Sequence, residues 1–142
     1  ATLNVLEACH HAHGIDISKE DLALEMDTMI DNRVVTLRHP KQQAIFKISA
    51  LVEKSIRSFF DAHDFTQITT PKLIGFPTEG GAEVFSLEYF EKKAYLAQSP
   101  QFYKQMMVPV FERVYEIGKA YRAEKSNSAR HLTEILMLDV EM

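Results

Sequence analysis

A group of charged side chains near the end of the sequence has the types and spacing that bind phosphate. The group combines basic residues with three carboxylates: Arg122, Glu124, Lys125, Arg130, His131, Asp139 and Glu141. Arginine presents a planar fork of N–H donors that matches phosphate oxygens, whereas the carboxylates suit a metal ion or an amine. The pattern suits a polyanion site, but taken alone it favours a solvated outer face with surface ion pairs.

Two strands would position these side chains. The alternation of residue types predicts strands from Arg113 to Glu124 and from Leu132 to Met142. Because successive side chains of a strand point to opposite faces, Arg122 shares a face with Glu116, and the acidic residues of the second strand lie opposite its leucines. Residues 125–131 are too many for a two-residue turn. We therefore expect an antiparallel pair joined by a polar loop, with charge gathered on one face.

Periodicity predicts the elements upstream. A helix begins at Pro40, and its apolar stripe consists of Ile45, Ile48, Val52, Ile56 and Phe59. The other expected elements are a strand over residues 65–70 stopped by Pro71, a strand around 94–97, and a helix through Met107 with Ser99 as its N-cap and Pro100 as its first residue. Met106 and Met107 are expected to fill the core.

The N-terminal part carries weaker signals. Two short helices are expected within residues 1–31, the second begun by a capping box at Ser18 and Asp21. Residues 31–38 have the pattern of a turn entering an extended segment. Cys9 lies beside three histidines, His10, His11 and His13, but no second cluster of such residues completes a metal-ligand pattern, so ordinary surface histidines are expected.

Composition sets broader limits. The chain has 142 residues, a formal net charge of -4 and 46% hydrophobic residues, which is ordinary for a globular protein. A single cysteine excludes an internal disulfide and favours a reducing compartment, so we expect a cytoplasmic protein. No apolar run reaches the roughly 20 residues of a membrane span. A pI near 5.9 argues against a broadly basic surface for nucleic acid.

Four blocks of the sequence, in order, resemble class II aminoacyl-tRNA synthetases. The predicted helix followed by residues 68–73 looks like motif 1 of that class (about residues 40–73), and residues 113–142 resemble motif 2. Residues 78–85 and 97–105 are similar to aspartyl enzymes of the eukaryotic and archaeal type. Together the four blocks identify the class far better than one short triplet such as Arg122-Ala123-Glu124 would.

The resemblance implies a fold and an activity. The fold would be α+β, an antiparallel sheet with flanking helices, with residues 31–142 forming part of a catalytic domain and residues 1–30 a helical segment or linker. The activity would be that of an aspartate–tRNA ligase, which uses ATP and Mg²⁺ to activate L-aspartate and transfers it to tRNA(Asp). Motif 1 implies a homodimer, with Phe59, Phe60 and residues 68–71 at its interface; the alternative is that a monomer buries Phe59 and Phe60.

The resemblance also implies roles in ATP binding. Arg122 matches the arginine that holds the α-phosphate and stabilises charge during the attack of the carboxylate, which makes it the expected catalytic residue. Glu124 matches a glutamate near the adenine and the 3′ end of the tRNA. The remaining positions implied are Arg130 and His131 near the β- and γ-phosphates, Ile135 against the adenine, and Glu141 as a ligand of Mg²⁺ and a contact of ATP.

Substrate selection would depend on other positions. Lys104 matches the lysine that pairs with the side-chain carboxylate of aspartate, and a cation there would reject the neutral amide of asparagine. The positions implied around the substrate amine are Gln101, Thr78 and Glu79, with Asp139 completing the polar wall. The alternative interpretation of Lys104, taken alone, is a surface lysine on a helix.

The chain departs from the class in three respects, one of which is that residues 105–112 form a segment one residue shorter than usual. Ile135 stands where a phenylalanine usually stacks on adenine, so a weaker contact with ATP is expected. The sequence ends at Met142 inside motif 2, so the 142-residue chain alone is expected to bind ATP poorly and to be inactive. Two alternatives stay open: a truncated or diverged non-catalytic dimerisation or binding module, and the sister asparaginyl-tRNA synthetase. Whether tRNA(Asn) is also a substrate is open too.

Overall fold

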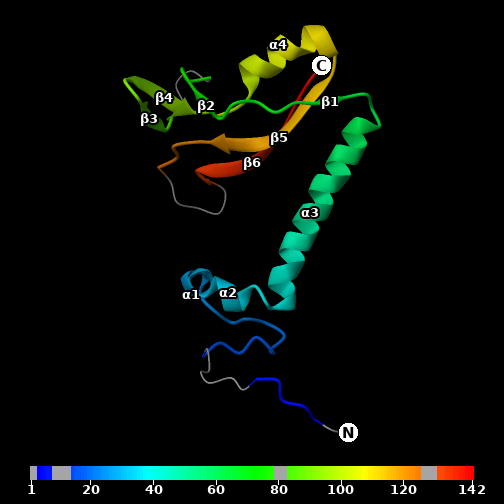
Figure 1. Ribbon diagram of the computed structural model, residues 1–142, viewed down its shortest axis with the longest axis vertical. Coiled ribbons are helices and arrows are strands. Elements are labelled where there is room, and N and C mark those ends of the chain that lie inside the picture. Colours follow the sequence, from blue (N-terminus) through cyan, green and yellow to red (C-terminus); the bar gives the residue numbers. More distant parts are fainter. Residues whose placement is uncertain (1–2, 8–13, 79–82, 126–130) are drawn as a thin grey trace. The chain divides into compact units, whose positions relative to one another are not determined.

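The computed structural model describes residues 3–7, 14–78, 83–125 and 131–142 (Figure 1). The chain divides into two compact units, residues 1–55 and 56–142. The elements in chain order are α1 (Met26–Asp31), α2 (Arg33–Thr36), α3 (Pro40–Asp61), β1 (Thr66–Gln67), β2 (Leu73–Ile74), β3 (Ser86–Tyr89), β4 (Lys92–Leu96), α4 (Gln101–Phe111), β5 (Val114–Tyr121) and β6 (Glu134–Glu141). In the described residues, no helix is both long and apolar enough to cross a membrane.

The first unit contains short helices where the sequence predicted an extended segment. That prediction for residues 31–38 was wrong, because Arg33–Thr36 form α2. Valine and threonine favour strands, but the Thr36 hydroxyl donates to the Met29 carbonyl at 3.0 Å and is completely buried. This contact holds the segment as a helical turn and outweighs the local preference.

The start of the first unit also differs from the sequence prediction. Residues 3–7 form no helix, and α1 begins at Met26 rather than at a capping box formed by Ser18 and Asp21. The Ser18 backbone N–H and hydroxyl instead donate to the Asp16 carboxylate at 3.0 and 2.6 Å. Ser18 therefore closes a local turn. The cysteine and the three histidines at residues 9–13 lie outside the described residues.

The long helix α3 confirms the strongest periodicity in the sequence. It runs from Pro40 to Asp61, and none of its residues is fully buried. Four side chains of its apolar stripe and the neighbouring Leu51 are each more than half exposed: Ile45, Ile48, Leu51, Val52 and Phe59. Its last residues, 56–61, belong to the second unit, where the Phe60 ring stacks on Tyr115 at 4.9 Å between centroids and meets Phe65 edge-on at 5.0 Å.

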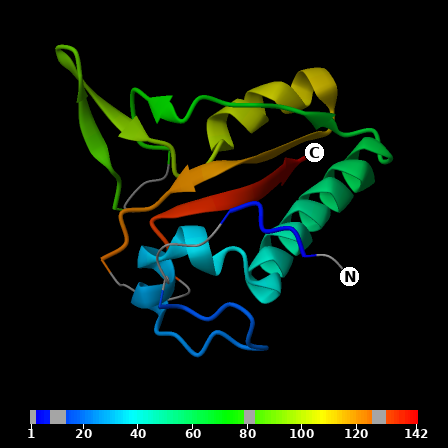
Figure 2. The ribbon, with the colours of Figure 1, turned by 60° about the horizontal axis from the view of Figure 1, so that its bottom comes forward.

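The second unit contains two three-stranded sheets. In the first sheet β5 lies between β1, which is parallel to it, and β6, which is antiparallel. In the second sheet β4 lies between β2 and β3, and both pairs are antiparallel. The views in Figures 1 and 2 show α4 alongside β5 and β6. The predicted antiparallel pair of long strands is therefore confirmed.

A short link of backbone hydrogen bonds joins the two sheets. The Ala97 N–H donates to the Lys72 carbonyl at 2.9 Å, and the Ala97 carbonyl accepts from the Tyr121 N–H at 2.9 Å. The segment that enters α4 is therefore bonded on one side to the chain before β2 and on the other to the end of β5. Ala97 is 2% exposed and belongs to the core of this unit.

Two predicted elements differ in extent. The strand expected over residues 65–70 is regular only at Thr66–Gln67, because the Thr70 N–H is bonded by the side chain of Glu116 rather than by a neighbouring strand. Helix α4 begins at Gln101 with Pro100 as its N-cap residue and no side-chain cap, so the predicted cap at Ser99 was wrong. The helix continues past Met107 to Phe111.

Candidate functional site

The centre of the site is a lysine held between two carboxylates. Lys104 projects from α4 toward β6, where its Nζ forms a short ion pair with Asp139 Oδ1 and lies 3.1 Å from Glu141 Oε2. Asp139 and Glu141 are two residues apart on one strand, so they share a face of the sheet. The charged face predicted from strand parity is therefore confirmed, and α4 supplies its cation.

This cluster is shielded from solvent. The Lys104 and Asp139 side chains are each 13% exposed, so the interpretation of Lys104 as a surface lysine was wrong. The alternative of a solvated outer face is wrong for Asp139, but it describes Arg122 and Glu124, which are exposed. Burial alone would lower the pKa of Lys104, but hydrogen bonds and attraction from Asp139 and Glu141 outweigh burial and raise the pKa above its ordinary value of 10.5. Lys104 is thus held as an ammonium ion.

A second buried ion pair lies on the same face. Glu116 is 2% exposed, and its carboxylate lies 2.9 Å from Lys72 Nζ. It also accepts hydrogen bonds from the backbone N–H and the hydroxyl of Thr70, each at 2.8 Å. Sequence reasoning placed Glu116 on this face but assigned it no role and missed Lys72. A lysine directly after the strand-ending proline was the available signal.

Several buried polar atoms near this face have no partner among the described residues. They are both side-chain polar atoms of Gln98, the Ser99 hydroxyl and the Thr78 hydroxyl. Gln98 and Ser99 are 1% and 7% exposed, and they follow Ala97, which is bonded to the end of β5. Since buried polar groups are normally paired, Gln98 and Ser99 are suited to contact a bound polar ligand. The sequence analysis gave Ser99 only a capping role and did not consider Gln98.

Apart from Glu141, the described residues implied in ATP binding lie toward the other end of β5 and β6. Arg122 and Glu124 are exposed just beyond β5, and the Arg122 N–H donates to the Thr133 carbonyl at 2.9 Å. His131 is exposed, and Ile135 lies half-buried on β6 opposite Ala120. No described contact joins these side chains to Lys104. Glu79 and Arg130 lie outside the described residues.

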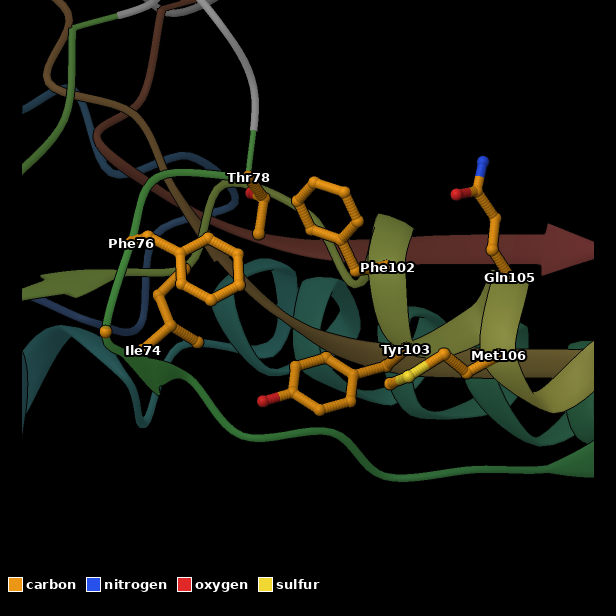
Figure 3. A pocket seen from close by; sticks show the side chains of 8 residues that line it. Ile74, Phe76, Thr78, Phe102, Tyr103, Gln105 and Met106 are labelled. Carbon is orange, nitrogen blue, oxygen red and sulfur yellow. The ribbon is translucent and has the colours of Figure 1, made fainter.

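The described residues implied around the substrate amine come from different parts of the chain. Gln101 lies one turn before Lys104 on α4 and is half-buried. Thr78 instead lines an apolar cavity of about 430 Å³, shown in Figure 3, with the rings of Phe76 and Phe102 5.7 Å apart at its wall. Met106 also lines this cavity and is 61% exposed, so its prediction as core filler was wrong.

The described side chains that could bind a metal ion do not form a preassembled metal site. Among the residues that the structure describes, no group of three or more His, Cys, Asp or Glu side chains could hold a metal ion. Mg²⁺ bound with a nucleotide commonly takes only one or two protein carboxylates, together with phosphates and water. The Glu141 side chain is 31% exposed, so one of its oxygens fits that limited role.

The family of the chain follows from its sequence. The family model described as "tRNA synthetases class II (D, K and N)" matches residues 25–142, which include every residue of the site. The chain belongs to this synthetase family. The α+β fold inferred from the resemblance is confirmed, since helices and antiparallel sheets combine as in the solved synthetases that it matches.

Curated synthetases of the aspartate type are similar over most of the chain. The aspartate–tRNA(Asp/Asn) ligase of Thermus thermophilus is 49% identical over 90% of this chain and 30% of its own length. The aspartate–tRNA(Asp) ligase of Pyrococcus horikoshii is 51% identical over 83% of this chain and 27% of its own length. The chain thus spans about 30% of the length of the curated relatives it matches.

Solved synthetase structures match the arrangement of the elements. The asparaginyl-tRNA synthetase of Pyrococcus horikoshii complexed with asparaginyl-adenylate has a TM-score of 0.78 and 34% identity, covering 82% of this chain and 27% of its own. A putative aspartyl-tRNA synthetase of Leishmania major has a TM-score of 0.77 and 44% identity, covering 88% of this chain and 24% of its own. The aspartyl and asparaginyl synthetases therefore share this architecture.

Proposed function

We propose that the full-length protein containing this chain is an aspartate–tRNA ligase and that residues 31–142 belong to its catalytic domain. The observation that carries the proposal is the shielded ammonium of Lys104 between Asp139 and Glu141. An ammonium has three N–H donors, and these two carboxylates engage two of them. The third donor is available to the side-chain carboxylate of aspartate.

The same cluster supports selection of aspartate over asparagine. Lys104 attracts a carboxylate, whereas the neutral amide of asparagine offers it no charge. The carboxylates of Asp139 and Glu141 give the cluster a formal charge of -1, which suits the ammonium group that a free amino acid also carries. Gln101, and Thr78 with Glu79, are proposed to complete the contacts of the substrate amine.

Activation of the amino acid needs positioning and charge stabilisation rather than a protein nucleophile. An oxygen of the aspartate α-carboxylate attacks the α-phosphorus of ATP, the bond to the leaving pyrophosphate breaks, and aspartyl-adenylate forms. Arg122 is proposed to hold the α-phosphate and to stabilise its growing charge. Mg²⁺ would neutralise the phosphates, with Glu141 as its protein ligand. Glu124, Arg130, His131 and Ile135 are proposed to bind the rest of ATP.

Transfer of the aminoacyl group completes the reaction. A ribose hydroxyl at the 3′ end of tRNA(Asp) attacks the acyl carbon of the adenylate, and AMP leaves.

Because protein synthesis and reduced thiols are both found in the cytoplasm, we place the protein there.

A homodimer is proposed through the exposed stripe of α3. Phe59 is 55% exposed, which leaves its ring available to a partner. Ile68 and Thr70, which the sequence analysis placed at the interface, are only 7% and 5% exposed, so their side chains are already covered within this chain. Sedimentation of the full-length protein as a monomer at micromolar concentration would contradict the dimer.

Pyrophosphate exchange with the full-length protein tests the proposed function. Radiolabelled pyrophosphate, ATP and Mg²⁺ are supplied with aspartate, asparagine or lysine, the three amino acids (D, N and K) of this synthetase family. Incorporation of label into ATP that depends on aspartate alone supports the proposal. Dependence on asparagine would identify the sister synthetase, and no exchange with any of the three would favour a non-catalytic module.

A further inference from the structure

We propose that Lys72 is a positioning residue of the aspartate site that acts through Glu116. The inference rests on the proposed function and adds a second lysine to its specificity. Lys72 lies at the start of the β2 region and neutralises Glu116, so that Lys104 and Asp139 keep the arrangement that admits a substrate carboxylate. This role does not require Lys72 to contact the substrate.

The register of β5 and β6 brings the two ion pairs together. Glu116 is the direct cross-strand partner of Asp139, and such partners have Cβ atoms about 5 Å apart. Lys72 pairs with Glu116 at 2.9 Å, and Lys104 pairs with Asp139 from the side of α4. The face therefore presents lysine, glutamate, aspartate and lysine in succession across the two strands.

The order of charges gives Lys72 its effect. Like charges directly opposite each other on a sheet repel, and Glu116 is almost fully buried, where screening by water is weak. The two lysines and three carboxylates of this face have a formal charge of -1. Without Lys72 the charge becomes -2, which draws Lys104 more strongly to its own carboxylates and repels the two carboxylates of a bound aspartate.

Hydrogen bonds hold Lys72 in this position, and Gly118 leaves room for its side chain. Its carbonyl accepts the hydrogen bond of Ala97, at the segment that leads into α4, and its Nζ donates to the Thr70 hydroxyl at 2.9 Å. A Cβ atom at Gly118 would lie 3.1 Å from Lys72 Nζ and 3.0 Å from the Glu116 carboxylate. Only glycine at position 118 leaves the Lys72–Glu116 ion pair the space that it occupies.

The effect should be larger for aspartate than for ATP, because Glu141 is the only residue of this face that is also proposed to contact ATP. Arg122 lies six residues after Glu116 along β5, about 20 Å at 3.3 Å per residue. That distance exceeds the Debye length of roughly 8 Å at physiological ionic strength. Loss of Lys72 should therefore change binding of aspartate, next to Asp139, much more than binding of ATP at Arg122.

The first test compares Lys72→Met with wild type in the full-length protein, by aspartate-dependent pyrophosphate exchange. We expect the KM for aspartate to rise about 10- to 100-fold, within the usual range of coupling between sites, and the KM for ATP to change less than about threefold. The double variant Lys72→Met/Glu116→Gln removes the uncompensated charge while Gln still accepts from the Thr70 N–H. It should return the KM for aspartate to within about threefold of wild type.

Two further variants make the result decisive. Lys119→Met removes a lysine whose ion pair is half-exposed, and it should leave both KM values unchanged. Gly118→Ala displaces the Lys72 ammonium while keeping every charge, so it tests the position if Lys72→Met does not fold, and a selective rise in the KM for aspartate is expected.

The outcomes separate this inference from the proposed function. Equal losses for aspartate and ATP without rescue in the double variant would reduce Lys72 to a structural role and overturn the inference. An unchanged KM for aspartate in Lys72→Met would also overturn it, while wild-type exchange would still support the ligase. No aspartate-dependent exchange by the wild type would defeat both.

Discussion

The two faces of the β5–β6 pair carry lysine–carboxylate pairs that differ chiefly in burial. On one face Lys119 and Glu134 lie 2.7 Å apart with both side chains 50% exposed. On the other face Glu116 is 3% exposed as a side chain next to Lys72, and Lys104 and Asp139 are each 13% exposed. Exposed pairs contribute little to stability, and buried pairs often stabilise less than apolar residues of equal volume. The buried pairs are therefore better explained by a site than by stability.

The largest expected effect follows from breaking the buried network at Glu116. Glu116→Ala removes the ion-pair partner of the Lys72 ammonium and the acceptor of the Thr70 N–H. Removing one member of a buried pair typically costs about 3–5 kcal/mol. We expect the opening free energy of β5, measured by hydrogen exchange in the full-length protein, to fall by about that amount. Unchanged protection would show that the network is solvated and weak.

The next effect concerns alkaline pH. The pKa of Lys104 is raised above 10.5 despite burial, through Asp139 and Glu141, and burial with a hydrogen bond to Asp61 raises the pKa of Tyr115 above 10.0. Both groups bind their protons more tightly in the folded state, so their contribution is complete below the unfolded values and is lost as pH rises through the folded ones. Each unit of difference corresponds to about 1.4 kcal/mol.

We therefore expect the stability of this region to fall as pH rises above about 10. Hydrogen exchange becomes too fast at such pH, so thermal unfolding followed by circular dichroism is the measurement. Tyr115→Phe should flatten the decline between pH 10 and the folded value, because phenylalanine does not titrate. If stability declines with pH as steeply in Tyr115→Phe and in Lys104→Met as in the wild type, the assignment to these two groups is contradicted.

The smallest effect is expected on the exposed face. Lys119→Met removes the partner of Glu134, and both side chains remain accessible to water. Surface pairs contribute about 0–1 kcal/mol, so the hydrogen exchange of β5 should change by less than about 0.5 kcal/mol. A loss as large as that of Glu116→Ala would remove the distinction between the two faces.

Sequence predicted the long elements because their periodicity agrees with their tertiary environment. The helix from Pro40 and the antiparallel strands containing Glu116 and Asp139 were predicted correctly. Strand parity also placed Asp139 and Glu141 on one face. Local propensity failed where a single tertiary contact decides, as at Thr36, whose hydroxyl binds the Met29 carbonyl.

The site was predictable only in part for a related reason. Lys104 came from the resemblance of residues 97–105 to known enzymes, and its partner Glu141 was expected to bind Mg²⁺ and ATP rather than a lysine. Lys72 and Glu116 are 44 positions apart, and a single sequence contains no sign that they touch. Their pairing depends on how the chain before β2 crosses β5, which only the fold reveals.

The measurement that most directly tests the central claim is aspartate selectivity in Lys104→Met. In pyrophosphate exchange with the full-length protein, kcat/KM for aspartate should fall about 30- to 1,000-fold, equivalent to about 2–4 kcal/mol, because the substrate carboxylate and Asp139 lose their shared cation. The preference for aspartate over asparagine should shrink with it, while Lys119→Met keeps both values. Wild-type kcat/KM and selectivity in Lys104→Met would contradict the account.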